Sequence, residues 1–165
     1  ANEQHRLTFV GVPCYPIFRR FNELFSTWGG TFINSTYLWF ASGGTNCGYQ
    51  YDLNDPIRGL AEGVLLSVRD AMDAMFDQTT MIRDSIEKFN IDGVIYHPIK
   101  SCRTVSTGLA DSRRQLMKDT GLASLFIESD MMDRRVVSEA QLKNRVDAFF
   151  EGLNSRKQQV VTVAS

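Results

Sequence analysis

The sequence predicts an open α/β fold, a mostly parallel sheet of about four strands with helices on both faces. Short apolar runs of strand length alternate with longer segments whose apolar residues recur at helical spacing, and glycine or proline stands at most boundaries. Strands joined by helical crossovers pair in parallel, so the expected arrangement is flavodoxin-like or Rossmann-like. A length of 165 residues with 43% hydrophobic content suits one core. We therefore expect residues 1–165 to form a single α/β domain.

A β-α-β unit is expected at the start of the chain. Residues 7–12 form a short apolar run, and residues 17–28 carry apolar side chains at helical spacing. Gly29 and Gly30 end that helix, and residues 31–33 supply the next strand. The spacing is that of a parallel crossover of ordinary length.

Residues 35–55 break the pattern, and we expect a long loop there. This loop is rich in aromatic residues, which are Tyr37, Trp39, Phe40, Tyr49 and Tyr51. A long aromatic loop is often functional, but its rings are equally suited to covering the core or to contacting a partner subunit.

The second half of the chain continues the alternation of helices and strands. Helical spacing extends over residues 56–89, with interruptions expected near Leu66–Ser67 and near Asp77–Gln78. The elements that follow are a strand at 91–96, a helix at 106–120, a strand at 124–127 and a last helix from Ser138. The tail after Arg156 is polar and then rich in valine, and we expect it to fray or to form an edge strand.

The composition excludes several classes of function. Eighteen Lys plus Arg against nineteen Asp plus Glu give a net charge of -1, so no whole-chain field recruits nucleic acid or an anionic membrane. No uncharged apolar stretch reaches the roughly 20 residues needed to cross a bilayer, and no signal peptide opens the chain. We therefore expect a cytoplasmic protein that binds neither nucleic acid nor membrane.

The start of the chain also carries information. The chain begins at Ala1, without an initiator methionine, and its first strand follows within a few residues. This start is expected for a piece of a longer protein that has been cut between domains. Removal of the methionine from a small complete protein is the alternative.

Cysteine is the most informative chemistry in the sequence. The three cysteines contain no C-x-x-C pair, which indicates neither a disulfide framework nor a self-contained zinc site. Ligands of an open α/β sheet bind beyond the carboxyl ends of the strands, and Cys14 and Cys102 are both expected at that edge. Lys100 and Arg103 flank Cys102, and a thiolate in such a setting is a competent metal ligand or nucleophile. A buried, inert cysteine is the alternative for either residue.

The other polar residues at this edge have plainer interpretations. His97 could serve in acid-base chemistry or be a satisfied strand-end group, and we favour the second. Glu128 and Asp130 could hold a cation or serve in acid-base chemistry, yet acidic residues after a parallel strand very often cap the next turn. The sequence contains no G-x-G-x-x-G fingerprint, no Walker A sequence and no G-x-S-x-G elbow.

Three segments in order, residues 91–103, 125–130 and 138–149, resemble the C-terminal part of a known family of catalytic subunits. The family is that of the benzoyl-CoA reductases and 2-hydroxyacyl-CoA dehydratases. Ser101 and Cys102 at the end of a Gly-Val-Ile-Tyr strand, followed by a Ser-Glu-Ala-Gln start to the last helix, carry the resemblance. It covers nearly the whole chain and is closer to the benzoyl-CoA reductase subunits.

The resemblance implies that this chain is the C-terminal fragment of a longer iron-sulfur subunit. The preceding domain would supply two further cysteines to a 4Fe-4S cluster, and Cys102 matches the third. With three thiolates, one iron stays open to substrate or solvent. Cys14 and Cys47 match no ligand position of the family. They are left to line the site or, if the chain is complete, to be the other ligands.

The implied activity is that of an oxidoreductase, an ATP-dependent and ferredoxin-driven benzoyl-CoA reductase that dearomatises its substrate in anaerobic aromatic degradation. Its implied partners are a paralogous catalytic subunit, ATP-hydrolysing activator subunits and an acyl-CoA substrate. One alternative is a 2-hydroxyacyl-CoA dehydratase subunit, in which a recycled electron forms a ketyl radical. Another, of a different class, is a non-catalytic α/β binding module. With one matching ligand, the isolated chain is expected to hold no cluster and to be inactive.

Overall fold

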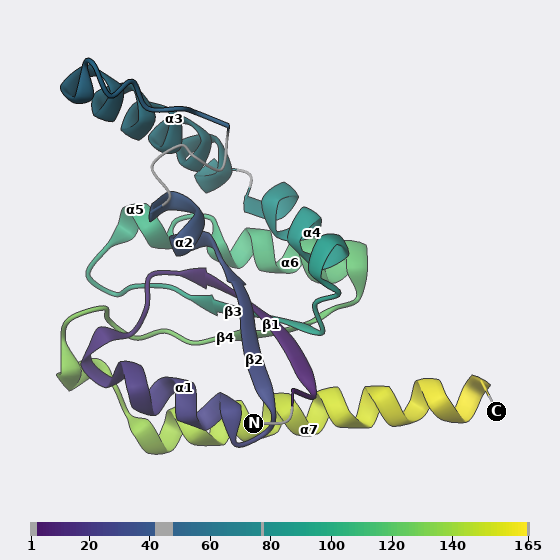
Figure 1. The fold of residues 1–165 in the computed structure, drawn as a ribbon. Coiled ribbons are helices and arrows are strands. Elements are labelled where there is room, and N and C mark those ends of the chain that lie inside the picture. The colour runs from purple at the N-terminus through teal and green to yellow at the C-terminus, as the bar shows by residue number, and fades with distance from the viewer. Residues whose placement is uncertain (1–2, 42–47, 77, 165) are drawn as a thin grey trace.

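A computed structural model describes residues 3–41, 48–76 and 78–164 of the chain. At its centre lies a sheet of four parallel strands in the order β2-β1-β3-β4 (Figure 1). The strands are β1 (His5–Gly11), β2 (Gly30–Ser35), β3 (Gly93–His97) and β4 (Ala123–Phe126). The predicted α/β class and the parallel four-stranded sheet are confirmed.

Helices cover both faces of the sheet, as predicted. The helices are α1 (Phe18–Ser26), α2 (Thr36–Ala41), α3 (Pro56–Phe76), α4 (Gln78–Phe89), α5 (Arg103–Ser106), α6 (Leu109–Thr120) and α7 (Glu139–Ala164), with 3-10 turns η1 (Tyr15–Ile17) and η3 (Arg134–Val136). Figure 1 shows α1 and α7 on one face and α4 and α6 on the other, while α3 reaches away from the sheet. No helix within the described residues is long and apolar enough to cross a membrane.

The two faces of the sheet have different cores. On the α7 face the core is aromatic, and the ring of Trp28 stacks on that of Phe150 with centroids 5.7 Å apart. A Cβ added at Gly30 would lie 2.6 Å from Phe150 Cζ, and one at Gly93 would lie 2.7 Å from Phe149 Cζ. Glycine at these two strand positions therefore lets α7 pack directly on the sheet. The core of the other face consists of Val10, Ile82, Val94, Tyr96, Leu109 and Leu116.

The strand order places a switch point at the middle of the sheet. β1 lies between β2 and β3 and is parallel to both. From β1 the chain crosses to one side for β2 and then to the other side for β3. Such a reversal opens a crevice at the carboxyl ends of the two central strands. The loops that follow Gly11 and His97, which are partners in the sheet, begin at this switch point.

The expectation of an unbroken loop at residues 35–55 is wrong, because α2 forms in its first part. Ser35 explains the helix: its Oγ accepts a hydrogen bond from the backbone N–H of Tyr37 at 3.2 Å, as a helix-capping serine does. The aromatic composition of this segment favours a loop, but the serine cap starts a helix. Residues 42–47, including Cys47, lie outside the described residues.

The interruption expected near Leu66–Ser67 is also wrong, because α3 runs through both residues without a break. Ser67 is buried within the helix, at 4% exposure. The second expected interruption falls at Asp77, which lies outside the described residues, between the end of α3 at Phe76 and the start of α4 at Gln78.

The C-terminal tail is a helix rather than a frayed end or an edge strand, which corrects the third expectation. α7 continues to Ala164 and extends past the sheet (Figure 1). Arg156 donates to the carbonyl oxygen of Gly121 at 2.9 Å, and the Lys157 ammonium lies 2.9 Å from a carboxylate oxygen of Asp92. The Arg, Lys and Gln residues of this stretch are good helix formers, and these contacts hold the helix to the segments just before β4 and β3.

Candidate functional site

The loops after β1, β3 and β4 meet at the carboxyl edge of the sheet. The loops after β3 and β4 run side by side: Ile99 and Ser129 form a parallel bridge, and Lys100 N donates to Ser129 O at 2.9 Å. Cys14, in the loop after β1, reaches the same place, because its Sγ lies 3.7 Å from the carbonyl oxygen of Asp130. Three strand ends that are distant in sequence therefore converge on Ser129 and Asp130.

His97, the last residue of β3, is fully buried. Its Nδ1 lies 2.6 Å from the carbonyl oxygen of Val12, which can only accept, so Nδ1 carries the proton. Nε2 then accepts from the Ser129 hydroxyl at 2.5 Å. Burial lowers the pKa of His97, which keeps the imidazole neutral. Both ring nitrogens are occupied inside the protein, which agrees with the favoured interpretation of a satisfied strand-end group.

Asp130 is a buried carboxylate that caps the turn after β4. Its Oδ2 accepts from Ser101 N at 3.1 Å, and its Oδ1 accepts from Met132 N at 2.9 Å and from Asp133 N at 3.0 Å. These hydrogen bonds, first of all those from Ser101, hold the pKa of Asp130 well below its usual range. The capping interpretation of Asp130 is confirmed, and the carboxylate positions the backbone next to Cys102.

Glu128, the other acidic residue after β4, lies apart from this network. It is exposed and its carboxylate lies 3.5 Å from the Lys100 ammonium. An exposed pair of this kind contributes little to stability. Glu128 and Asp130 therefore have separate partners and do not form a shared cation site.

Cys14 is enclosed by the loops. Its side chain is 2% exposed, and its Sγ lies 3.7 Å from both the Asp130 carbonyl oxygen and the Ser129 hydroxyl. Burial raises the pKa of the Cys14 thiol, so the protonated form is favoured. The structure thus agrees with a buried, protonated cysteine at this position.

Cys102 lies at the same edge of the sheet but is more exposed than Cys14. It precedes α5, is half-buried, and donates its backbone N–H to Ile99 O at 3.2 Å. Its Sγ has no hydrogen-bond partner within the described part of the chain. The neighbouring backbone is fixed, because Ser101 N is held by Asp130. A free sulfur on an anchored loop is suited to bind a metal or a metal cluster.

A complete metal site is not formed by the described residues. No group of three or more His, Cys, Asp or Glu side chains among them is arranged to hold a metal ion. Cys14 is bound within the protein, and Cys47 lies outside the described residues. Cys102 therefore offers a single free thiol, and the described residues do not bring further free thiols to it.

Ser129 is the residue of this site that the sequence analysis missed. Its hydroxyl joins His97 to Cys14, and its backbone pairs with the loop that leads to Cys102. The only sequence signal is its place between Glu128 and Asp130, just after the predicted strand. A serine at such a position is too common to be singled out by sequence alone.

Comparison with known proteins places the whole fold in context. Residues 1–153 match the family described as 2-hydroxyglutaryl-CoA dehydratase, D-component. The chain is 30% identical over 155 residues to a benzoyl-CoA reductase subunit of Thauera aromatica, which covers 94% of this chain and 35% of that protein. It is 26% identical over 165 residues to the (R)-2-hydroxyisocaproyl-CoA dehydratase alpha subunit of Clostridioides difficile, covering 95% and 36%. The (R)-phenyllactyl-CoA dehydratase alpha subunit of Clostridium sporogenes is 26% identical over 159 residues, covering 96% and 36%. The chain spans about a third of the length of these relatives.

Proposed function

Because the chain belongs to the 2-hydroxyglutaryl-CoA dehydratase D-component family, we propose that it is the cluster-binding C-terminal part of a catalytic subunit of an acyl-CoA reductase. In this proposal Cys102 is one thiolate ligand of a 4Fe-4S cluster, and the remaining ligands come from outside the described residues. The enzyme would be an ATP-dependent, ferredoxin-driven oxidoreductase of the benzoyl-CoA reductase type, located in the cytoplasm.

One observation carries this proposal: the Cys102 sulfur has no hydrogen-bond partner among the described residues. Cys102 stands at the switch-point edge on a loop fixed by Asp130, yet its Sγ has no partner among the described residues. Cys14 and His97, at the same edge, are both satisfied within the protein. Of the three, Cys102 alone offers a donor atom without a competing internal bond.

The residues of this chain would contribute positioning and protection from water. A bound cluster would supply low-potential one-electron chemistry. Asp130 would fix the Cys102 backbone, and the neutral His97 would hold the loops after β1 and β4 against each other. A cysteine held in this way loses little further freedom when it binds a metal.

The dehydratase relatives define the second candidate, a 2-hydroxyacyl-CoA dehydratase subunit that uses ketyl-radical chemistry. The identity to the reductase subunit is 30%, and that to the isocaproyl-type dehydratase subunit is 26%. This margin favours the reductase. Because these relatives are subunits of larger enzymes, we propose that activity requires a paralogous subunit, ATP-hydrolysing activator subunits and an acyl-CoA substrate.

Anaerobic reconstitution with iron and sulfide tests the proposal. The 165-residue chain alone should bind far less than a stoichiometric cluster, because one free thiolate is too few. The longer subunit that carries this chain should bind a full cluster, lose it in Cys102→Ala and retain it in Cys14→Ala. A stoichiometric cluster on the chain alone would overturn the single-ligand assignment. Retention of cluster and activity in Cys102→Ala would overturn the metal assignment and favour the non-catalytic α/β module.

A further inference from the structure

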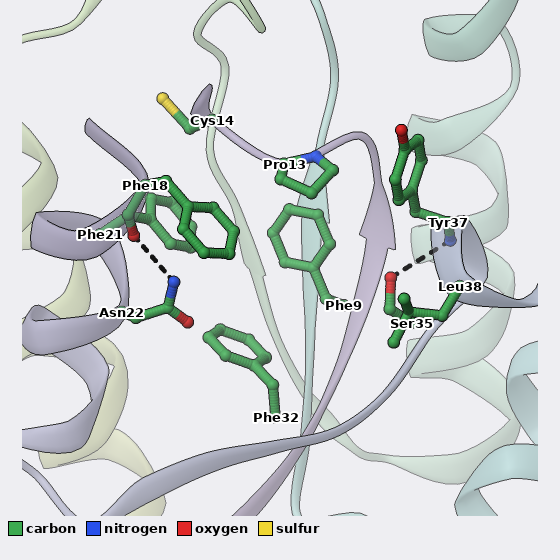
Figure 2. A pocket seen from close by; sticks show the side chains of 10 residues that line it. All are labelled: Phe9, Pro13, Cys14, Phe18, Phe21, Asn22, Phe32, Ser35, Tyr37 and Leu38. Atoms are coloured by element: carbon green, nitrogen blue, oxygen red, sulfur yellow. Dashed lines mark hydrogen bonds between the residues drawn. The ribbon is translucent and has the colours of Figure 1, made fainter. Parts of the chain in front are cut away.

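Two surfaces of the chain expose apolar side chains, and they lie in different places. The first surrounds a hollow at the carboxyl end of β1, which the exposed residues Phe18 and Leu38 help to line (Figure 2). Cys14 borders this hollow, so the first surface belongs to the candidate site. The second surface lies on α3, which reaches away from the sheet (Figure 1). The candidate site does not account for it.

One face of α3 is covered. The segment 48–55 packs against the helix, because a Cβ added at Gly59 would lie 3.2 Å from the backbone nitrogen of Asp52. Small residues follow one another at four-residue spacing on this face, and Gly59, Gly63 and Ser67 are all buried. The segment and the helix together form an arm, residues 48–76, which extends from the body of the protein (Figure 1).

The opposite face of α3 is apolar and open to solvent. Ile57, Leu60, Val64 and Leu65 are 79%, 56%, 47% and 68% exposed, and Ala61 between them is exposed as well. Their spacing of three and four residues places all five on one stripe, on the side of the helix away from the buried glycines. We call these five residues the α3 stripe. A continuous apolar face that is turned to solvent marks a surface that another protein covers.

The area of the α3 stripe is that of one half of a small interface. An unfolded chain exposes about 1.45 Å² per dalton, or roughly 160 Å² for a leucine or isoleucine residue. At the observed exposures the stripe leaves on the order of 500 Å² open on one chain, together with Leu53, which is 86% exposed just before α3. Two copies that pair through this face would bury up to about 1,000 Å², which is the lower bound for a specific interface. A weak and reversible dimer is therefore expected.

The charges beside the α3 stripe do not require an oppositely charged partner. Arg58 and Glu62 lie on one flank of the stripe, and Arg58 Nε lies 2.8 Å from a carboxylate oxygen of Glu62. The two charges therefore neutralise each other within one chain. A strongly acidic or basic partner would bury its own charges here without gaining a counter-charge. The stripe fits a surface that is apolar and uncharged, as the stripe itself is.

The spacing of the α3 stripe also matches a second copy of itself. Ile57, Leu60 and Val64 occupy the a, d and a positions of a heptad, and Ala61 takes the e position beside them. In an antiparallel pair related by a two-fold axis, Leu60 of one chain lies against Val64 of the other, and the two Ala61 side chains meet near the axis. The small side chain of Ala61 lets the two helices approach closely.

We propose that the outer face of α3 is a dimer interface, on which a second copy of this chain pairs antiparallel through the α3 stripe. The proposal goes beyond the proposed function and needs neither a cluster nor Cys102. It depends on the exposed stripe, on its neutral flank and on its self-complementary spacing.

Sedimentation equilibrium of the 165-residue chain in reducing buffer tests the proposal. A monomer–dimer equilibrium is expected, with a Kd on the order of 10 to 100 μM. Leu60→Glu places a charge at the centre of the stripe and should weaken the dimer by at least about 30-fold. Met132→Glu places the same charge on an apolar residue outside the arm, which is 70% exposed, and should leave the dimer unchanged. A chain that stays monomeric up to about 1 mM, or equal dimerisation of wild type and Leu60→Glu, would overturn the proposal.

Disulfide cross-linking tests the antiparallel arrangement. In a background of Cys47→Ser and Cys102→Ser, Ala61→Cys should form an intermolecular disulfide on mild oxidation, because position 61 lies near the two-fold axis. In the same background Ile57→Cys should cross-link at least about tenfold less, because the two copies of position 57 lie about 12 Å apart along the helices. Equally efficient cross-linking at both positions would indicate a parallel pair and overturn the arrangement.

Other occupants of the α3 stripe give different results in the same experiments. If the chain is monomeric and Leu60→Glu instead abolishes binding of the longer subunit to a paralogous subunit, the second-copy assignment is wrong. A dimer that depends on Leu60, with no cluster on the longer subunit, would contradict the proposed function and leave the dimer interface standing. A cluster that depends on Cys102, in a chain that does not dimerise, would do the reverse.

Discussion

The loop after β1 and the loop after β3 each carry one cysteine to the same edge of the sheet, yet the two side chains differ in exposure and in hydrogen-bond partners. Cys14 is 2% exposed, and its sulfur lies within hydrogen-bonding distance of both Ser129 and Asp130. Cys102 is half-buried, and its sulfur has no partner among the described residues. The same position at a strand end therefore produces one enclosed thiol and one available thiol.

The loop after β4 causes this difference. It places the backbone carbonyl of Asp130 against Cys14, and the Asp130 carboxylate against the backbone of Ser101. Asp130 thus covers the sulfur of Cys14 and fixes the backbone next to Cys102. The strand-end rule locates candidate residues, but the neighbouring loop decides which of them is free to react.

The largest effect on this comparison is expected from His97→Ala. The change removes a buried ring, and it leaves the Val12 carbonyl and the Ser129 hydroxyl without their partner. The free energy of unfolding should fall by about 3 to 5 kcal/mol. Urea unfolding followed by circular dichroism measures the change.

A conservative variant serves as the control for His97→Ala. In His97→Asn an amide N–H can replace Nδ1–H as the donor to Val12, so the loss should be about half as large. A loss below about 1 kcal/mol in His97→Ala would contradict the view that His97 holds the strand ends together.

Thiol alkylation compares the two cysteines directly. In a Cys47→Ser background, iodoacetamide should modify Cys102 about 100-fold faster than Cys14, because Cys14 reacts only after a local opening of the loops. Mass spectrometry of the two peptides over time gives both rates. Similar rates at the two positions would show that the enclosure of Cys14 is not maintained in solution.

The sequence was sufficient for the sheet and for the position of its chemistry. Alternating apolar runs and helical spacing predicted the four strands, and the strand-end rule brought Cys14 and Cys102 to one edge. Asp130 was predicted as a turn cap from its place after a parallel strand. These features depend on local pattern and on general rules of chain connection.

The features that the sequence did not predict depend on contacts between distant residues. The enclosure of Cys14 comes from Ser129 and Asp130, which lie 115 and 116 positions after Cys14 in the sequence. The hollow at the carboxyl end of β1 is lined by rings from separate elements, and no spacing rule relates Phe9 to Phe32. The helical tail after Arg156 is held by Gly121, a contact across 35 positions.

Alanine substitution of each cysteine tests the comparison on a smaller scale. Cys14→Ala should lower the free energy of unfolding by about 1 to 2 kcal/mol, because it leaves a small void and removes the contacts with Ser129 and Asp130. Cys102→Ala should change it by less than about 0.5 kcal/mol, because the sulfur makes no hydrogen bond among the described residues. Chemical unfolding under reducing conditions measures both. The reverse order of the two effects would contradict the assignment of roles.

The smallest effect is expected from pH. Burial lowers the pKa values of His97 and His5, so below the pKa of an unfolded histidine, about 6.5, the unfolded chain binds more protons than the folded one. Stability is therefore full above that pH and falls as the pH decreases through it. Asp130, whose pKa is also lowered, adds a second loss of stability below about pH 4.

Urea midpoints from about pH 8 to about pH 5 should decline in the wild type. They should decline less in His97→Asn, where His5 is the one buried histidine that still takes up a proton on unfolding. A wild-type midpoint that rises with acidification, or an equal decline in both proteins, would show that His97 is not held in its neutral form and that the network enclosing Cys14 is weaker than its geometry indicates.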